Sequence, residues 1–341
     1  MRASKRLRNI PAESSGVATL LLSGSAGVYA AEVLFNGEPR VVLLDTGSPL
    51  SWFKQHAGDD ALPTHGQRDG DSYADGRSIE GEFRYAELRL SSHAEAASDS
   101  DVTVLDAGCL LVHDSTGTTG PGIDQGIVGL SIRQASAFVH DGKPHPGDLI
   151  VRLLQQLPSR VISFSLDRAQ AQAAFWTAHG PSSVRFGGLH GDEDRYVWTA
   201  PVARSTVEWI VEMPVSFAGR GGASEPSTVR VLVDTGCSDF KMTPALGKAM
   251  SDQWGMQVEA PCPARHELES LCVRFIVGGE RLEVPALDLI LHDEDDDRQC
   301  NRIRLDGGLE SHDMVFGLAL LAGLEAVAFC YATRRIGFAP R

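Results

Sequence analysis

The sequence has no run of about 18 apolar residues, so it predicts no membrane-spanning helix. It also has no Gly-x-x-x-x-Gly-Lys motif and no Gly-x-Gly-x-x-Gly motif after a strand, so nothing in it indicates nucleotide chemistry. Basic residues number 31 against 45 acidic ones, a formal net charge of −14, and form no stripe with interleaved aromatics. This balance argues against nucleic acid as a partner.

Cysteine is too scattered to form a metal site. The six residues stand at positions 109, 237, 262, 272, 300 and 330, without a Cys-x-x-Cys pair or a histidine at finger spacing. The acidic run at 293–297 lacks the alternating ligands and turn glycine of a calcium loop, so we interpret it as a solvated turn. We expect no metal and no cofactor. Cys262 and Cys300 are candidates for one disulfide, because both lie in polar, loop-like surroundings and flank a strand-rich stretch.

The 341 residues, 43% hydrophobic and 22% charged, have the composition of a globular protein with room for two lobes. We interpret residues 1–16 as a basic extension. They resemble a signal peptide superficially, but the apolar segment at 17–22 is short. Cleavage after Ala30 would also remove half of a hairpin at 27–44, whose Asn36-Gly37 turn separates two alternating apolar runs.

Short strands separated by glycine-rich turns dominate the pattern, which predicts an all-β protein. The strands are expected at residues 17–22, 27–35, 40–44, 78–90, 102–112, 161–166, 183–186, 209–217, 228–233, 271–277, 281–284, 287–291 and 335–338. Helical periodicity is confined to residues 147–157, 244–254 and 317–324.

One motif occurs twice. Residues 41–48 read VVLLDTGS, and residues 231–238 read VLVDTGCS. A hydrophobic-hydrophobic-Gly segment follows each copy at nearly the same spacing, with Gly129 placed 84 residues after Asp45 and Gly317 placed 83 after Asp234. Matched spacing of this kind indicates an internal duplication into two related lobes.

This pair of motifs is similar to that of the pepsin-like aspartic proteases, from about residue 17 to the C-terminus. Further landmarks agree in order: 73–76 with Gly81 resembles the flap hairpin, 126–130 the segment closing the first lobe, 184–188 the interlobe strand, and 335–339 the C-terminal strand. The resemblance implies a bilobal fold with two barrel-like lobes and a cleft between them. We place the N-terminal lobe at 17–165, with a flap at 69–82, and the C-terminal lobe at 166–341.

The resemblance makes Asp45 and Asp234 the catalytic pair. Two carboxylates about 3 Å apart repel by roughly 5 kcal/mol at an effective dielectric near 20, so such a pair holds one proton between its members. The ionised member can take a proton from water while the other protonates the peptide carbonyl oxygen. From the sequence alone, the member that is ionised at rest stays open.

The neighbours of the pair have implied supporting roles. Thr46 and Thr235 resemble the family's crossed threonines, which bond the opposite lobe. Gly47 and Gly236 let backbone amides approach the carboxylates. Ser48 is expected to hydrogen-bond Asp45. Cys237 stands where the family has Thr or Ser, and its thiol is a weaker partner that we expect to alter the pH profile. Without a histidine nearby in sequence, it is not interpreted as a nucleophile.

Substrate contacts are implied for the flap residues Tyr73, Ala74, Asp75 and Gly76, and for Ile127. Gly76 and Gly81 would give the flap mobility. Trp52 is interpreted either as a support for the flap tyrosine or as a plain core residue. Gln125 and Leu318 depart from the family, which has Asp at both places; we expect altered support and retained activity.

The sequence therefore predicts an aspartic endopeptidase that works at acidic pH on an extended peptide, is inhibited by pepstatin-like compounds and is monomeric. The resemblance implies a secreted or acidic vacuolar setting, although the N-terminus gives no convincing signal peptide. The alternative is a pepsin-like protein that has lost catalysis and serves as a binding or inhibitor protein. The presence of both Asp residues and Tyr73 argues against it. A dimer of single lobes is disfavoured, because both halves of the pair lie in one chain.

Overall fold

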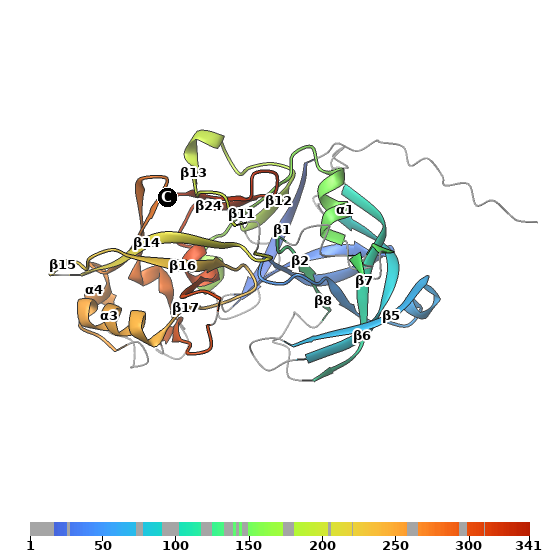
Figure 1. Ribbon diagram of the computed structural model, residues 1–341, viewed down its shortest axis with the longest axis horizontal. Coiled ribbons are helices and arrows are strands. Elements are labelled where there is room, and N and C mark those ends of the chain that lie inside the picture. Colours follow the sequence, from blue (N-terminus) through green and yellow to red (C-terminus); the bar gives the residue numbers. More distant parts are fainter. Residues whose placement is uncertain are drawn as a thin grey trace, which may run out of the picture.

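The structure is a computed structural model that describes residues 17–25, 28–72, 78–90, 102–116, 125–132, 139–140, 143–144, 149–172, 181–203, 206–219, 221–257, 265–292, 299–309 and 311–341. Strands dominate it, as the sequence predicts, and helices are few and short. Figure 1 shows the first part of the chain, blue to green, as one lobe, and the later part, yellow to red, as a second lobe beside it. Within the described residues, no helix has the length and apolar character needed to cross a membrane.

The N-terminal half is built on long antiparallel strands. Its elements are β1 (Ala18–Ser25), β2 (Val28–Phe35), β3 (Glu38–Asp45), β4 (Trp52–Lys54), η1 (Asp59–Ala61), β5 (Thr64–Ser72), β6 (Ser78–Leu90), β7 (Val102–Thr116), β8 (Gly126–Gly129), β9 (Val139–His140), β10 (Lys143–Pro144), α1 (Leu149–Gln156), β11 (Val161–Ser165), α2 (Arg168–Gln172), β12 (Ser183–Phe186), η3 (Glu193–Arg195) and β13 (Val197–Trp198).

The C-terminal half has its own eight-stranded sheet, ordered β19-β18-β14-β16-β23-β17-β22 with β15 paired to β14. Its elements are β14 (Ile210–Gly219), β15 (Gly222–Ala223), β16 (Ser227–Val233), β17 (Phe240–Met242), α3 (Pro244–Trp254), α4 (Arg265–Leu268), β18 (Cys272–Val277), β19 (Glu280–Pro285), η4 (Ala286–Leu289), β20 (Ile290–His292), β21 (Gln299–Asn301), β22 (Ile303–Leu305), β23 (Met314–Phe316), α5 (Leu318–Leu321), β24 (Ala326–Cys330) and β25 (Arg335–Ala339).

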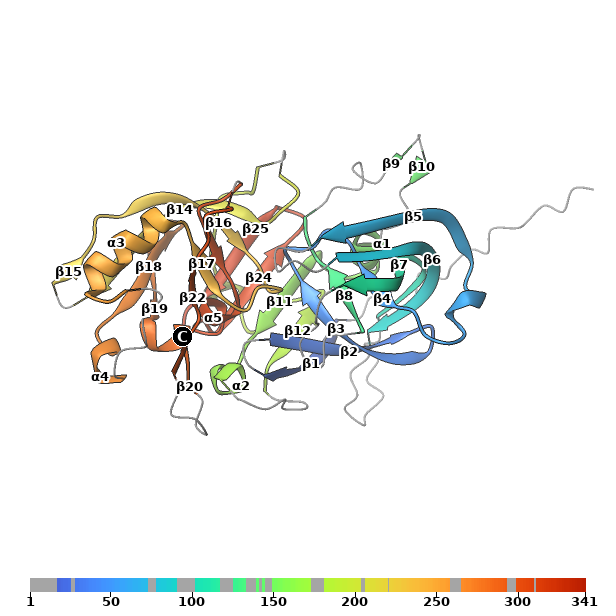
Figure 2. The ribbon, with the colours of Figure 1, turned by 90° about the horizontal axis from the view of Figure 1, so that it is seen from below.

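A shared sheet joins the two halves. The 13-stranded sheet runs β13-β25-β24-β11-β12-β1-β2-β3-β8-β4-β7-β6-β5. It contains strands from both ends of the chain, with β11 and β12 between β24 and β1. Figure 2 shows β1, β11 and β12 between the two lobes. The boundary predicted at residue 165 falls at the end of β11, which pairs with β24 from the end of the chain.

Local sequence accounts for the hairpin that leads to the first motif. Phe35 pairs with Glu38 across the Asn36-Gly37 turn, and both turn residues have positive φ, 52° and 83°. Two successive positive φ values define the tight hairpin turn that Asn-Gly favours. The predicted hairpin is therefore confirmed, and it fixes the register of β3 down to Asp45.

One predicted strand is partly wrong. Residues 287–291 were expected to be extended, but Ala286–Leu289 form the 3-10 turn η4 before β20 begins at Ile290. Ala286 and Leu289 are fully buried. A short apolar run satisfies a buried helical turn as well as a buried strand, so periodicity alone does not separate them.

Candidate active site

Asp45 stands at the end of β3, where the chain leaves the sheet. β3 runs parallel to β8, with Asp45 opposite Gly129, and the Leu130 amide donates to the Asp45 carbonyl oxygen at 2.7 Å. The turn beyond then folds back on the carboxylate. The amides of Gly47 and Ser48 donate to Asp45 Oδ1 at 2.8 and 3.1 Å, and Ser48 Oγ lies 2.5 Å from Oδ2. The predicted Ser48 contact is present.

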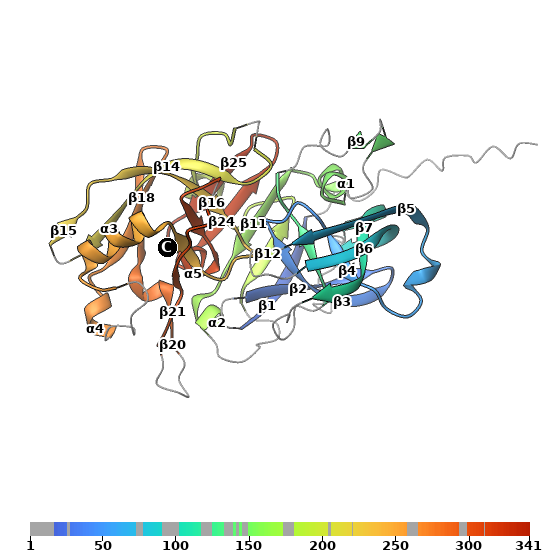
Figure 3. The same ribbon diagram turned by 60° about the horizontal axis from the view of Figure 1, so that its bottom comes forward.

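Asp234 is held in the same way in the second lobe. β16 runs parallel to β23, with Val233 opposite Phe316, and the Asp234 amide donates to the Phe316 carbonyl oxygen at 3.1 Å. The Gly236 amide donates to Asp234 Oδ1 at 2.8 Å. Each Asp therefore follows a buried strand that is flanked by its hydrophobic-hydrophobic-Gly partner. Figure 3 shows β3 in one lobe and β16 in the other.

The threonines that follow the two Asp residues interlock across the lobes. The Thr46 amide donates to Thr235 Oγ1 at 3.1 Å, and the Thr235 amide donates to Thr46 Oγ1 at 3.0 Å. Each hydroxyl in turn donates to a carbonyl of the other lobe, that of Val233 at 3.0 Å and that of Leu44 at 2.7 Å. Both threonines are buried, so these bonds fix the two Asp loops relative to each other.

The glycines of the two motifs show how closely the carboxyls approach the opposite loop. A Cβ at Gly236 would lie 2.2 Å from Asp45 Cγ, and a Cβ at Gly47 would lie 2.7 Å from Asp234 Cγ. Each carboxyl therefore packs directly on the glycine of the other lobe. Only a residue without a side chain fits at either place.

The pKa of Asp234 lies well above its usual range. Burial is the largest cause, followed by the negative charge of Asp45 and a hydrogen bond with the Asp45 side chain. The amides of Gly236 and Cys237 act in the opposite direction. Asp234 thus keeps its proton at a pH where an exposed carboxyl would have lost it.

Cys237 does not occupy the expected supporting position. Its thiol donates to the carbonyl oxygen of Asp239, with Sγ 3.4 Å from that oxygen. The thiol forms no hydrogen bond with the Asp234 carboxyl. Burial and the nearby Asp234 raise the pKa of Cys237 to about 12. The two lobes are therefore unequal here, since Ser48 donates its hydroxyl to Asp45 and Cys237 gives Asp234 only a backbone amide.

The flap lies partly within the described residues. β5 and β6 pair as a hairpin up to Ser72 opposite Ser78, while Tyr73, Ala74, Asp75 and Gly76 lie outside the described residues. Of the predicted disulfide partners, Cys262 lies outside the described residues, and so does the side chain of Cys300. Gly81, expected to give the flap mobility, lies within β6, and a Cβ there would be 2.2 Å from the Leu111 carbonyl oxygen. Close packing on β7 requires that glycine.

A small hydrophobic cluster supports the flap strands. It consists of Leu43, Leu50, Trp52, Ile79, Phe83, Leu110, Val112 and Ile127. Trp52 and Ile127 are paired across β4 and β8 and are 4% and 2% exposed. Trp52 is thus a core residue beneath the hairpin. Ile127 is positioned to support that wall of the site, and little of its side chain is open to a substrate.

Gln125, one of the two departures noted in the sequence, has a clear structural role. Its Oε1 accepts the Val41 amide at 2.6 Å, and its backbone carbonyl accepts the Lys54 amide at 2.9 Å. It therefore joins β3 to the chain before β8. The other departure, Leu318, is buried at the start of α5, where its amide donates to the Cys237 carbonyl oxygen at 2.7 Å.

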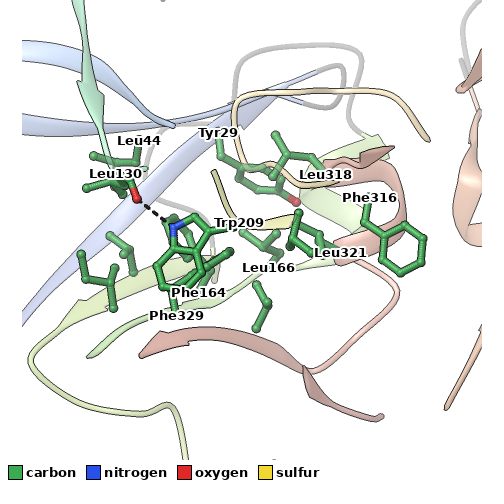
Figure 4. Close-up of a cluster of buried hydrophobic side chains, with 14 of the residues drawn as sticks. Tyr29, Leu44, Leu130, Phe164, Leu166, Trp209, Phe316, Leu318, Leu321 and Phe329 are labelled. Carbon is green, nitrogen blue, oxygen red and sulfur yellow. Dashed lines mark hydrogen bonds between the residues drawn. The ribbon is translucent and has the colours of Figure 1, made fainter. Parts of the chain in front are cut away.

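Two residues near the pair were missed in the sequence analysis. Trp209 Nε1 donates to the Leu130 carbonyl oxygen at 3.0 Å, a contact drawn in Figure 4, and the Tyr331 hydroxyl donates to the same oxygen at 2.6 Å. Their partner lies 79 and 201 residues away. No local pattern in the sequence signals such contacts. The only hint is that a buried indole N–H usually needs a hydrogen-bond acceptor.

Comparison with known proteins agrees with this arrangement. The model of the family described as eukaryotic aspartyl protease matches residues 36–341. Among solved structures, the chain is similar to an aspartic proteinase from Irpex lacteus, with a TM-score of 0.75 and 16% sequence identity over 95% of this chain and 97% of that one. The predicted bilobal, pepsin-like fold is confirmed by this similarity. A search of curated protein sequences found no match.

Proposed function

The chain belongs to the eukaryotic aspartyl proteases, and from that premise we propose that it is an endopeptidase whose catalytic pair is Asp45 and Asp234. The observation that carries the proposal is the mutual packing of the two carboxyls on each other's loops, with a hydrogen bond between them. Two carboxyls so placed share one proton over a wide acidic range.

The proposed reaction needs no covalent intermediate. A water held between the carboxyls loses a proton to the ionised member and attacks the peptide carbonyl carbon, while the protonated member donates its proton to the carbonyl oxygen. The resulting tetrahedral diol collapses when its C–N bond breaks. The carboxyl that took the proton from water gives it to the departing nitrogen, and the other carboxylate takes a proton from a diol hydroxyl as the new carboxylic acid forms. The fixed amides of Gly47, Ser48 and Gly236 hold the carboxylate oxygens in place during these transfers.

The substrate is proposed to be a protein or peptide bound in extended form between the lobes, beneath the hairpin of β5 and β6. Pepstatin-like compounds should inhibit the enzyme. The functional unit is proposed to be a monomer, because one chain supplies both carboxyls. We place its activity in an acidic setting, secreted or vacuolar; a tagged protein found only in neutral compartments would count against that placement.

The test is hydrolysis of an unfolded protein between pH 2 and 7, with and without pepstatin, by the wild type and by Asp45→Asn and Asp234→Asn. Acidic, pepstatin-sensitive cleavage that both substitutions abolish is the expected result. If correctly folded wild-type protein cleaves nothing at any pH, the proposal fails, and a binding or inhibitor role takes its place.

A further inference from the structure

The Leu130 peptide is bonded on both sides. Its amide donates to the Asp45 carbonyl oxygen at 2.7 Å. Its carbonyl accepts Trp209 Nε1 at 3.0 Å and the Tyr331 hydroxyl at 2.6 Å. Leu130 is fully buried, so its carbonyl oxygen is hydrogen-bonded by these two donors in place of water. The backbone of Asp45 is therefore one peptide away from two side chains of the C-terminal half.

Trp209 also reaches the other catalytic loop. Its backbone carbonyl accepts the Val233 amide at 3.1 Å, and Val233 directly precedes Asp234. This bond continues the β14–β16 ladder beyond the pair Ile210 and Leu232. One residue thus bonds the segment beside Asp45 through its side chain and the segment beside Asp234 through its main chain.

A second bond runs parallel to the first. Ser131 Oγ donates to the Val207 carbonyl oxygen at 2.8 Å, and the Ser131 amide donates to the Ser48 carbonyl oxygen at 3.2 Å. Ser48 is the residue whose hydroxyl bonds the Asp45 carboxylate. The segment before β14 is therefore joined to the Asp45 loop at two points.

The indole has little freedom to move. Trp209 is fully buried, and its ring meets those of Phe329 and Tyr331 edge-on, with centroids 5.1 and 5.0 Å apart. Figure 4 shows Phe164 and Phe329 beside the ring, with Leu130 at its nitrogen. An aromatic side chain that is held both by packing and by a directed hydrogen bond has a more tightly fixed position than one held by packing alone.

From these contacts we propose that Trp209 and Tyr331 are positioning residues, which hold the Leu130 peptide, and through it Asp45, at the correct separation from Asp234. This inference rests on the proposed function, since it assigns the two residues to the same catalytic pair. They touch neither substrate nor carboxyl. Their effect on catalysis comes from the geometry that they impose on the Asp45 loop.

The test compares Trp209→Phe, Tyr331→Phe and the double variant with two matched controls. Trp254→Phe is the first control, because Trp254 is also mostly buried and its Nε1 has no hydrogen-bond partner among the described residues. Tyr196→Phe is the second, because its hydroxyl donates to a carbonyl, that of His190, at 2.8 Å, away from the pair. Each test variant and its control undergo the same chemical change.

We expect each single variant to lower kcat about five-fold with KM unchanged, the effect of one lost hydrogen bond. The double variant should lose more than the product of the singles, about 50-fold or more, because a buried carbonyl is left without a donor. The pH profile of kcat should also shift in the test variants and stay fixed in the controls. An active enzyme whose kcat and profile do not change in the double variant overturns the proposal.

Hydrogen–deuterium exchange separates this inference from the proposed function. In the double variant, amides in the peptides that cover Asp45 and Leu130 should exchange at least about ten-fold faster, while the controls should match the wild type. If the double variant exchanges faster than the wild type and the wild type cleaves nothing, the positioning role is supported and the proposed protease function is refuted. Unchanged exchange would refute the positioning role, whatever the activity.

Discussion

An alanine at position 236 is expected to displace the Asp45 carboxyl. Its Cβ would lie 2.2 Å from Asp45 Cγ, whereas ordinary van der Waals contact begins at 3.4 Å, so the two must separate by about 1.2 Å. The carboxyl cannot turn away freely, because Gly47 and Ser48 donate to both of its oxygens. The displacement therefore changes the distance between the two carboxyls of the proposed catalytic pair.

The size of the effect follows from that distance. A misplacement of about 1 Å in reacting groups costs about 100-fold in rate, so Gly236→Ala should reduce kcat by at least that factor. Gly47→Ala requires a smaller movement, about 0.7 Å, because its Cβ would lie 2.7 Å from Asp234 Cγ. Its loss of activity should be smaller. Neither glycine has a φ in the left-handed region, so backbone strain adds nothing in either variant.

The assay is kcat for an unfolded protein and for a fluorogenic peptide at the pH optimum, with thermal unfolding measured on the same samples. Gly221→Ala is the matched control, since its Cβ would meet no atom within 4 Å, and it should behave as the wild type. The reasoning is refuted if folded Gly236→Ala keeps more than half of the wild-type kcat. It is refuted equally if Gly47→Ala proves the more damaging of the two.

Three further outcomes follow from the same contacts. Thr235→Val loses one donated and one accepted bond across the lobes, so urea unfolding should show a loss of about 2 kcal/mol, while Thr235→Ser should keep most of it; equal losses in both would contradict this. The pKa of Asp234 is raised in the folded state, so the stability that the protonated Asp234 contributes is fully present below about pH 4 and is lost as pH rises through the folded pKa. Asp234→Asn should therefore have a higher melting temperature than the wild type only above about pH 4. A difference in melting temperature that is constant from about pH 3 to 7 would contradict this prediction. Cys237→Thr adds a stronger donor beside Asp234, which should move the upper limb of the activity profile to lower pH; an identical profile would show that the hydroxyl makes no such bond.

The fold was predictable where a local pattern encodes a pairing. Each Asp-Thr-Gly follows an apolar strand, and each companion segment ends in a glycine that a neighbouring backbone approaches. A Cβ at Gly317 would lie 2.1 Å from the Asp239 carbonyl oxygen, and one at Gly129 would lie 2.7 Å from those of Ser48 and Leu50. The matched spacing in the sequence thus reflects a real steric requirement, repeated in both lobes.

The remaining features depend on contacts that no local pattern contains. Trp209 and Leu130 meet across 79 residues, and the run that forms η4 is apolar enough for either a turn or a strand. Cys237 could be expected to face Asp234, but a nearer carbonyl at Asp239 accepts its thiol. In each case, competition between alternative partners in three dimensions decides the outcome.

That competition makes the surroundings of the two carboxyls in the proposed catalytic pair unequal. The Asp45 carboxylate accepts two amides and the Ser48 hydroxyl. Apart from its hydrogen bond with Asp45, Asp234 receives only backbone amides, because the thiol of Cys237 donates to the Asp239 carbonyl. Hydrogen bonds from donors favour the ionised form of a carboxyl, and Asp45 has the larger set of such donors. The shared proton is then expected to rest on Asp234, whose pKa is already raised by burial and by the charge of Asp45. In the proposed reaction, Asp45 accordingly acts first as the base toward water, and Asp234 first as the acid toward the peptide carbonyl.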